Sequence, residues 1–246
     1  MSASAFPRLR HRLLRASDAQ PSRLVVLFHG LGGNLGELAP LAERWLSSLP
    51  STGFLLLEAP DRDYHERTLL SGEFSGDWYK FPRLRSEFGA DEHAYESMVE
   101  QCISDRCDHV NLEADQHANA LGLGNDRMIM AGFSQGAALS AYAGLRRRCL
   151  GVLPMGGPCP PRERLLPPRS ADDPTSVCVV VGDNDHCAPH EEIRACFSKY
   201  AKGGAPTHRG AARAVDGVHV IPGMRHEIAE PHATIGLAFL KSLGCR

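Results

Sequence analysis

The chain has 246 residues, of which 43% are hydrophobic and 23% charged, and its formal net charge at pH 7 is −2. This composition is that of a soluble globular protein, and the length suits one large domain spanning residues 1–246. A net charge so close to zero excludes the strong field that recruits nucleic acid or acidic lipid. No apolar run approaches the roughly 20 residues that a membrane span requires.

Cysteine and histidine usage bears on the redox compartment and on metals. Eight cysteines occur without any Cys-x-x-Cys pair, and several lie in apolar runs such as residues 177–179. Free thiols in a reducing compartment, the cytoplasm, are therefore expected. The His-Glu pairs that begin at His190 and His226 lack the second histidine of a zinc-protease motif. The sequence predicts no metal site and no cofactor.

The first segment of the chain has two interpretations. Four arginines and no acidic residue within the first 17 positions would suit an organelle transit peptide. However, Leu9, His11 and Leu13 alternate with arginines, which favours an edge strand within residues 1–20. The continuous apolar run at 23–28 then predicts a central strand that is covered on both faces.

Strands and helices alternate along the rest of the chain. Further apolar runs predict strands at 53–57, 127–131, 150–154 and 177–181, with a weaker one at 218–221. Helical patterns lie between them at about 35–49, 90–119, 135–148, 189–202 and 230–243. This alternation predicts an α/β fold with a mostly parallel sheet and helices on both faces. Two segments look irregular, 60–89 and 158–175, and we expect 60–89 to form a wall or cover over a functional site.

A G-x-S-x-G pentapeptide at residues 132–136 follows the predicted strand 127–131 and opens the next helix. Strand, turn and helix in this order are what a nucleophile elbow requires. Ser134 would then stand at a helix N-terminus, where backbone N–H groups favour negative charge. The alternative is a glycine-rich turn in which Ser134 only caps the helix.

Acyl transfer also needs hydrogen-bond donors for an oxyanion. Gln135 supplies one through its backbone N–H, because it directly follows the nucleophile. The segment 28–33 follows the strand 23–28, and its glycines let the main chain approach a substrate, so the backbone N–H of Leu31 is the expected second donor. A phosphate-binding loop is the alternative for 28–33, but the lysine of a P-loop is missing.

The acid and the base should follow the nucleophile in that order, each after a later strand. Two aspartates follow the strand 177–181, and we favour Asp185 because the later residue of the turn can reach across the sheet. Asp183 is then a turn former or helix cap. His226 is the first histidine past the last predicted strand, whereas His219 lies within that strand and His232 within the final helix.

Together these motifs resemble the acyl-protein thioesterase and small carboxylesterase family, also called the phospholipase/carboxylesterase family. The likeness runs from about residue 23 to the C-terminus and rests on residues 29–32 and 132–136, on Gly182 with Asp185, and on residues 223–226. It implies a compact α/β-hydrolase fold with little or no lid domain. It also implies cleavage of carboxylic esters or thioesters without a cofactor. The family commonly has proline directly after the acid, where this chain has His186.

The expected reaction is attack by Ser134 on an acyl carbonyl, with His226 as general base and Asp185 as its carboxylate. Residues 76–79 resemble the tryptophan-containing segment near the family's acyl pocket, and Leu31, Trp78 and Met224 are the expected substrate-binding residues. Trp78 could equally be ordinary core. The substrate could be a small molecule, a lysolipid or an acylated protein, and a homodimer stays open. Rival interpretations are a lactone or peptide hydrolase with the same triad and a non-catalytic ligand binder.

Overall fold

A computed structural model of the protein describes residues 6–16, 20–60, 77–79, 92–157, 173, 175–198, 200 and 216–246. Its centre is a seven-stranded sheet in the order β1-β3-β2-β4-β5-β6-β7. The edge strand β1 runs antiparallel to β3, and all other neighbours are parallel. The strands are β1 (His11–Leu14), β2 (Arg23–Phe28), β3 (Thr52–Leu57), β4 (Met128–Phe133), β5 (Gly151–Met155), β6 (Ser176–Gly182) and β7 (Gly217–Ile221).

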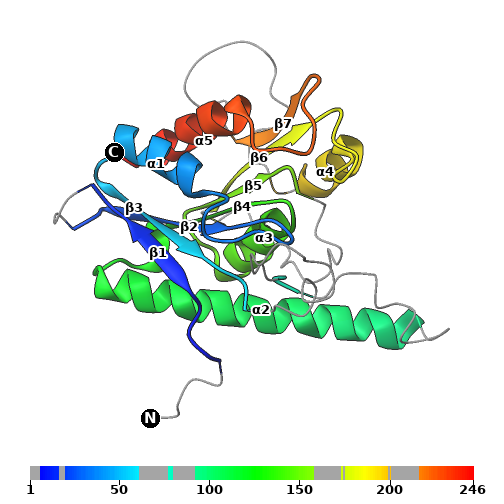
Figure 1. Ribbon diagram of the computed structural model, residues 1–246, viewed down its shortest axis with the longest axis horizontal. Helices are drawn as coiled ribbons and strands as arrows, with labels where there is room; N and C mark the ends of the chain where they lie inside the picture. Colours follow the sequence, from blue (N-terminus) through cyan, green and yellow to red (C-terminus); the bar gives the residue numbers. More distant parts are fainter. Residues whose placement is uncertain are drawn as a thin grey trace, which may run out of the picture.

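Helices cover both faces of the sheet (Figure 1). Helices α1 (Ala39–Ser48) and α5 (Glu230–Ser242) pack on one face, in a cluster around Trp45. On the other face lie α2 (Glu92–Ala120), α3 (Gln135–Arg147) and α4 (His190–Phe197). The predicted mostly parallel sheet with helices on both faces is thus confirmed.

The continuous apolar runs explain why these strands are central. Every residue of β3, β4 and β5 is buried, because each strand has neighbours on both sides and helices on both faces. Helix α1 begins later than the predicted 35–49. Asn34 holds the preceding turn, since its carbonyl accepts a hydrogen bond from the Glu37 N–H and its side chain accepts one from the Gly36 N–H.

The cysteines depart from the expectation of free thiols at one position. Six described cysteines are free, namely Cys102, Cys107, Cys149, Cys178, Cys187 and Cys245. Cys196, however, is disulfide-bonded. An apolar sequence context predicts burial but does not reveal which thiol meets another in space, so composition alone missed this bond.

The parallel strands bring their carboxyl ends to one edge of the sheet. Ser134 follows β4, Asp185 follows β6 and His226 follows β7. In open parallel sheets this edge is where ligands bind. None of the helices within the described ranges is long and apolar enough to cross a membrane. The segments 60–89 and 158–175, one of them the expected cover, fall largely outside these ranges.

Candidate active site

The turn between β4 and α3 places Ser134 in a strained backbone conformation. Its φ is 54° and its ψ is −120°, values that non-glycine residues rarely adopt. The flanking glycines make the tight turn possible. A Cβ on Gly132 would lie 2.2 Å from the Gly136 carbonyl oxygen, and a Cβ on Gly136 would lie 2.2 Å from the Phe28 carbonyl oxygen. The turn therefore has the close backbone packing that a nucleophile elbow needs.

Replacing Gly136 by alanine should destabilise the protein, because the new methyl group meets rigid backbone at the end of β2 rather than a flexible side chain. We expect the free energy of unfolding to fall by about 1–3 kcal/mol or more. Thermal melting should show a lower Tm. Gly36→Ala is the matched control, since its Cβ would meet only the Asn34 side chain, at 3.0 Å, in an exposed turn. Equal melting temperatures for the two variants would contradict this account.

Three side chains from separate strand ends form one hydrogen-bonded chain. The His226 Nε2 lies 3.0 Å from the Ser134 Oγ, and its Nδ1 lies 2.9 Å from the Asp185 Oδ2. A carboxylate only accepts hydrogen bonds, so it holds the proton on Nδ1 and leaves the lone pair of Nε2 facing the serine hydroxyl. This is the geometry in which an imidazole can take a proton from an alcohol.

The two candidate aspartates have different surroundings. The side chain of Asp185 is fully buried, and its Oδ1 accepts hydrogen bonds from the backbone N–H groups of Cys187, at 2.9 Å, and Ala188, at 3.0 Å. Asp183 is exposed, and its Oδ1 accepts a hydrogen bond of 2.6 Å from the Gly223 N–H. Asp183 thus ties the loop after β6 to the loop that carries His226, and does not touch the histidine itself.

The segment after β2 is held from several sides. The His29 Nδ1 donates to the Gly30 carbonyl at 2.7 Å, and its Nε2 accepts from the Ala59 N–H at 3.0 Å. Burial lowers the pKa of His29, which keeps this ring neutral. The Trp78 Nε1 donates to the His29 carbonyl at 2.8 Å. His29 is therefore a fixed support at the start of the predicted oxyanion loop.

The predicted oxyanion donors come from two separate segments of the chain. Gln135 is the first residue of α3, and Leu31 follows Gly30 in the loop after β2. Among the described residues, neither backbone N–H has a hydrogen-bond acceptor. The Gln135 side chain has a separate task. Its Oε1 accepts from the Trp78 N–H at 2.9 Å, and its Nε2 donates to the Tyr79 carbonyl at 2.8 Å.

Glu37 is a residue of the site that the sequence motifs did not reveal. Its Oε2 accepts a hydrogen bond of 2.6 Å from the Gly30 N–H, and a Cβ built on Gly30 would lie 3.2 Å from the Ser134 Cβ. Burial raises the pKa of Glu37, opposed by the Gly30 hydrogen bond and the nearby His226. Glu37 is therefore a positioning residue, because it fixes the loop one residue before the predicted donor Leu31.

Glu37→Ala should lower kcat by roughly 10- to 100-fold, because the loop loses its anchor and a shift near 1 Å in a catalytic group can cost about 100-fold. Glu37→Gln should retain much more activity, since an amide oxygen can still accept the Gly30 hydrogen bond. Steady-state kinetics with one ester substrate would compare the two variants. Equal losses, or a change confined to KM, would mean that Glu37 does not position this loop.

The predicted substrate-binding residues differ in their exposure. Leu31 is partly exposed in the loop after β2. Trp78 is completely buried, and its ring lies edge-on to Phe28 at a centroid distance of 5.4 Å. Met224 is 6% exposed and belongs to the core cluster on the α1 and α5 face. These surroundings favour packing roles for Trp78 and Met224 and leave Leu31 as the accessible member of the set.

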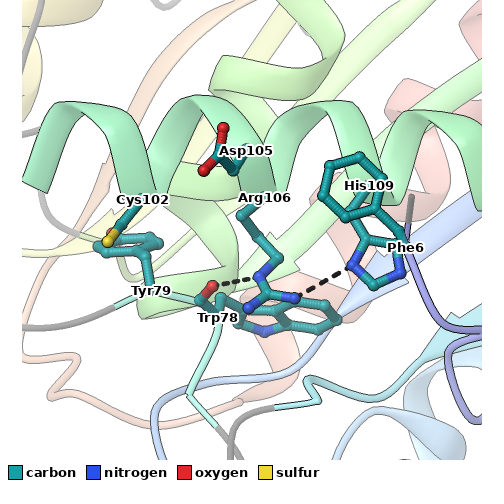
Figure 2. A pocket seen from close by; sticks show the side chains of 7 residues that line it. All are labelled: Phe6, Trp78, Tyr79, Cys102, Asp105, Arg106 and His109. Carbon is teal, nitrogen blue, oxygen red and sulfur yellow. Dashed lines mark hydrogen bonds between the residues drawn. The ribbon is translucent and has the colours of Figure 1, made fainter.

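A cavity of about 180 Å³ lies between residues 77–79 and helix α2. Figure 2 shows Arg106 reaching across it from α2, with its guanidinium bonded to the Trp78 carbonyl oxygen and to His109. Phe6 stacks on the His109 ring. None of the three triad residues lines this cavity, whereas Trp78, one of the predicted substrate-binding residues, does.

The surroundings of three other histidines differ from those of His226. His219 is within β7, as its position in the apolar run indicated, and His186 is exposed. His232 lies in the first turn of α5, and its Nδ1 accepts a hydrogen bond of 3.1 Å from the Ala229 N–H. Burial lowers the pKa of His232 to about 4, so this ring is neutral and caps the helix.

Three residues at the site carry atoms of the kind that can bind a metal ion. Ligand atoms of Asp185, Cys187 and His226 lie within 4.8 Å of one another. Both Asp185 oxygens already face the His226 Nδ1, and Oδ1 also accepts two backbone hydrogen bonds. The carboxylate and the ring are thus engaged with each other, which suits proton transfer rather than metal binding.

The sheet topology and the strand-end turn that bears Ser134 are those of an α/β-hydrolase. A family model described as Phospholipase/Carboxylesterase matches residues 10–236, and the chain belongs to this carboxylesterase-like family. This confirms the family and the fold class expected from the motifs. None of the curated protein sequences compared with the chain matches it significantly.

Solved structures share the fold at low sequence identity. Esterase PE8 is 22% identical with a TM-score of 0.71, over 96% of this chain and 100% of that one. A carboxylesterase from Bacillus cereus is 17% identical with a TM-score of 0.66, over 96% and 94% of the two chains. SOBER1 from Arabidopsis thaliana is 18% identical with a TM-score of 0.62, over 90% and 98%. At these identities the likeness shows the fold.

Proposed function

We propose that the protein is a serine hydrolase that cleaves carboxylic esters or thioesters through an acyl-enzyme on Ser134. The observation that carries the proposal is the hydrogen-bonded chain from the Ser134 Oγ through His226 to the buried Asp185. The strained backbone of Ser134 adds support, because strain of this kind persists where the surrounding structure holds it for a purpose.

In the proposed reaction the Ser134 oxygen attacks the acyl carbonyl carbon while the His226 Nε2 takes its proton. The backbone N–H groups of Leu31 and Gln135 stabilise the oxyanion. As the intermediate collapses, His226 gives the proton to the leaving alcohol or thiol, which departs and leaves the acyl group on Ser134. Water then attacks the acyl-enzyme by the same steps, which releases the acid and restores the serine.

We infer the substrate class from the family and from the proposed reaction, which needs no cofactor. Two structural neighbours are named as an esterase and a carboxylesterase, so an acyl ester is the first candidate. A thioester has the same carbonyl geometry and a better leaving group, and it needs no further residue. Lysolipids and acylated proteins belong to this class, whereas a lactone or peptide would use the same three side chains.

The test is a matched series of esters and thioesters of increasing acyl length, together with fluorophosphonate labelling of the full chain. We expect covalent labelling and measurable hydrolysis of at least part of the series, with kcat/KM varying with acyl length. A folded protein that is neither labelled nor active on any member would instead be a non-catalytic ligand binder. Faster hydrolysis of peptides or lactones than of every ester and thioester in the series would show that the proposed substrate class is wrong.

A further inference from the structure

A second cluster of reactive side chains lies away from the proposed catalytic centre. His11 begins β1, and Glu113 and His117 are four residues apart on α2, so they share one face of that helix. One ligand atom from each residue lies within 4.8 Å of the other two. The His11 and His117 rings are edge-on, with centroids 4.3 Å apart.

Two of these groups carry buried polar atoms that no other described residue satisfies. Glu113 is 2% exposed, and its Oε1 accepts from the Leu9 N–H at 3.1 Å. Its Oε2 has no hydrogen-bond partner within the described parts of the chain, and neither has the buried Nε2 of His117. A buried oxygen and nitrogen left unpaired cost free energy unless a further group binds them. A single further group bound between the Glu113 Oε2 and the His117 Nε2 would satisfy both atoms.

The hydrogen bond that His11 makes leaves its other ring nitrogen able to bind a metal ion. The His11 Nδ1 lies 3.2 Å from the Leu9 carbonyl, which only accepts, so this nitrogen carries the proton and Nε2 keeps the lone pair. A second ring nitrogen bonded to a backbone carbonyl is the usual arrangement of a metal-bound histidine.

We infer that His11, Glu113 and His117 form a site for a divalent transition-metal ion such as Zn²⁺, which joins the edge strand β1 to helix α2. Two imidazoles and a carboxylate are a common zinc ligand set, with water in the fourth position. Tetrahedral zinc separates such ligand atoms by roughly 3.4 Å. His11 is exposed, so its side chain can move by the short distance that closes the site. Arg8 forms an ion pair with the other glutamate oxygen, Oε1, at 3.2 Å.

The ion would stabilise the fold rather than take part in hydrolysis. His11 pairs with Leu57 at the edge of the sheet, and β1 is three strands away from β4, which ends at Ser134. At about 4.8 Å per strand this is a lateral separation of roughly 14 Å. Binding should therefore raise the melting temperature and leave the hydrolytic rate unchanged.

The test is calorimetric titration of the full chain with ZnCl₂ after treatment with EDTA and desalting, with MgCl₂ as a second titrant. We expect one zinc ion per chain, a Tm that rises to a plateau with added zinc, and no binding of Mg²⁺, because imidazole ligands disfavour it. Removal of a group that only hydrogen-bonds to a metal ligand typically weakens metal binding by about 10- to 100-fold. His11→Gln removes a ligand itself, so it should weaken zinc binding by more than that. It should not change the metal-free Tm.

Two further variants test whether zinc binding depends on this particular histidine and on the negative charge of Glu113. His190→Gln is the matched control, because the His190 Nε2 lies 3.7 Å from a Glu191 oxygen and no third ligand joins them among the described residues. This variant should bind zinc like the wild type. Glu113→Gln keeps an oxygen for the Leu9 N–H but loses the charge, so it should also weaken zinc binding.

The cluster of Asp185, Cys187 and His226 is the alternative place for zinc, so the variant Cys187→Ser and the rate of ester hydrolysis complete the experiment. We expect zinc binding to survive in Cys187→Ser and hydrolysis by the wild type to be equal with and without bound zinc. The inference is wrong if the wild type binds no zinc, if His11→Gln binds it as tightly as His190→Gln does, or if Cys187→Ser alone abolishes binding.

Discussion

Ser134→Ala is expected to abolish both ester hydrolysis and fluorophosphonate labelling while the protein stays folded. Removal of the nucleophile leaves only binding and oxyanion stabilisation, and in another serine hydrolase this costs on the order of 10⁶-fold in kcat. The fold should survive because the hydroxyl makes one hydrogen bond, of 3.0 Å, to His226, while the turn depends on its glycines.

Ser140→Ala is the matched control for that experiment. Ser140 is a buried serine of α3, the helix that directly follows Ser134, and its hydroxyl donates to the Ala137 carbonyl rather than to a histidine. This variant should be labelled and active like the wild type, and both variants should keep a Tm near that of the wild type. Undiminished labelling in folded Ser134→Ala would show that another residue is the nucleophile.

The fold and the central chain of the site could be predicted because local rules determine them. Apolar runs mark the buried strands, and the carboxyl ends of parallel strands meet at one edge of the sheet. Ser134, Asp185 and His226 follow three such ends, so strand positions alone bring them close. The choice between Asp183 and Asp185 was harder, since two residues of one turn differ only in where their side chains point.

Other parts of the site depend on contacts that no local pattern encodes. Glu37 reaches back to the Gly30 N–H, and a lone glutamate in a polar turn looks like a solvated residue. The two histidines of the proposed metal site, His11 and His117, are 106 positions apart in the chain, so a search for closely spaced histidines could not find them. A resemblance places Trp78 at the acyl site. Its side chain is completely buried and donates a hydrogen bond to the His29 carbonyl, which favours a role in holding that loop.

Asp185→Asn is expected to lower kcat by about 10³- to 10⁴-fold with little change in Tm. The amide oxygen can keep the two backbone hydrogen bonds from Cys187 and Ala188. Its NH₂ group then faces the His226 Nδ1, where the carboxylate Oδ2 now lies at 2.9 Å. Two donors cannot face each other, so the ring takes the opposite tautomer, with its proton on Nε2, and can no longer accept the proton of Ser134.

Asp183→Asn is the matched comparison, one turn position away. The Asp183 Oδ1 accepts a single hydrogen bond from the Gly223 N–H in an exposed place, and an asparagine oxygen can accept it equally well. We therefore expect kcat to change by less than about tenfold, because no group that faces His226 is altered. Both variants would be compared with the wild type by steady-state kinetics and thermal melting. If Asp183→Asn lost activity and Asp185→Asn kept it, Asp183 would be the carboxylate of the triad, and the hydrolase assignment itself would still stand.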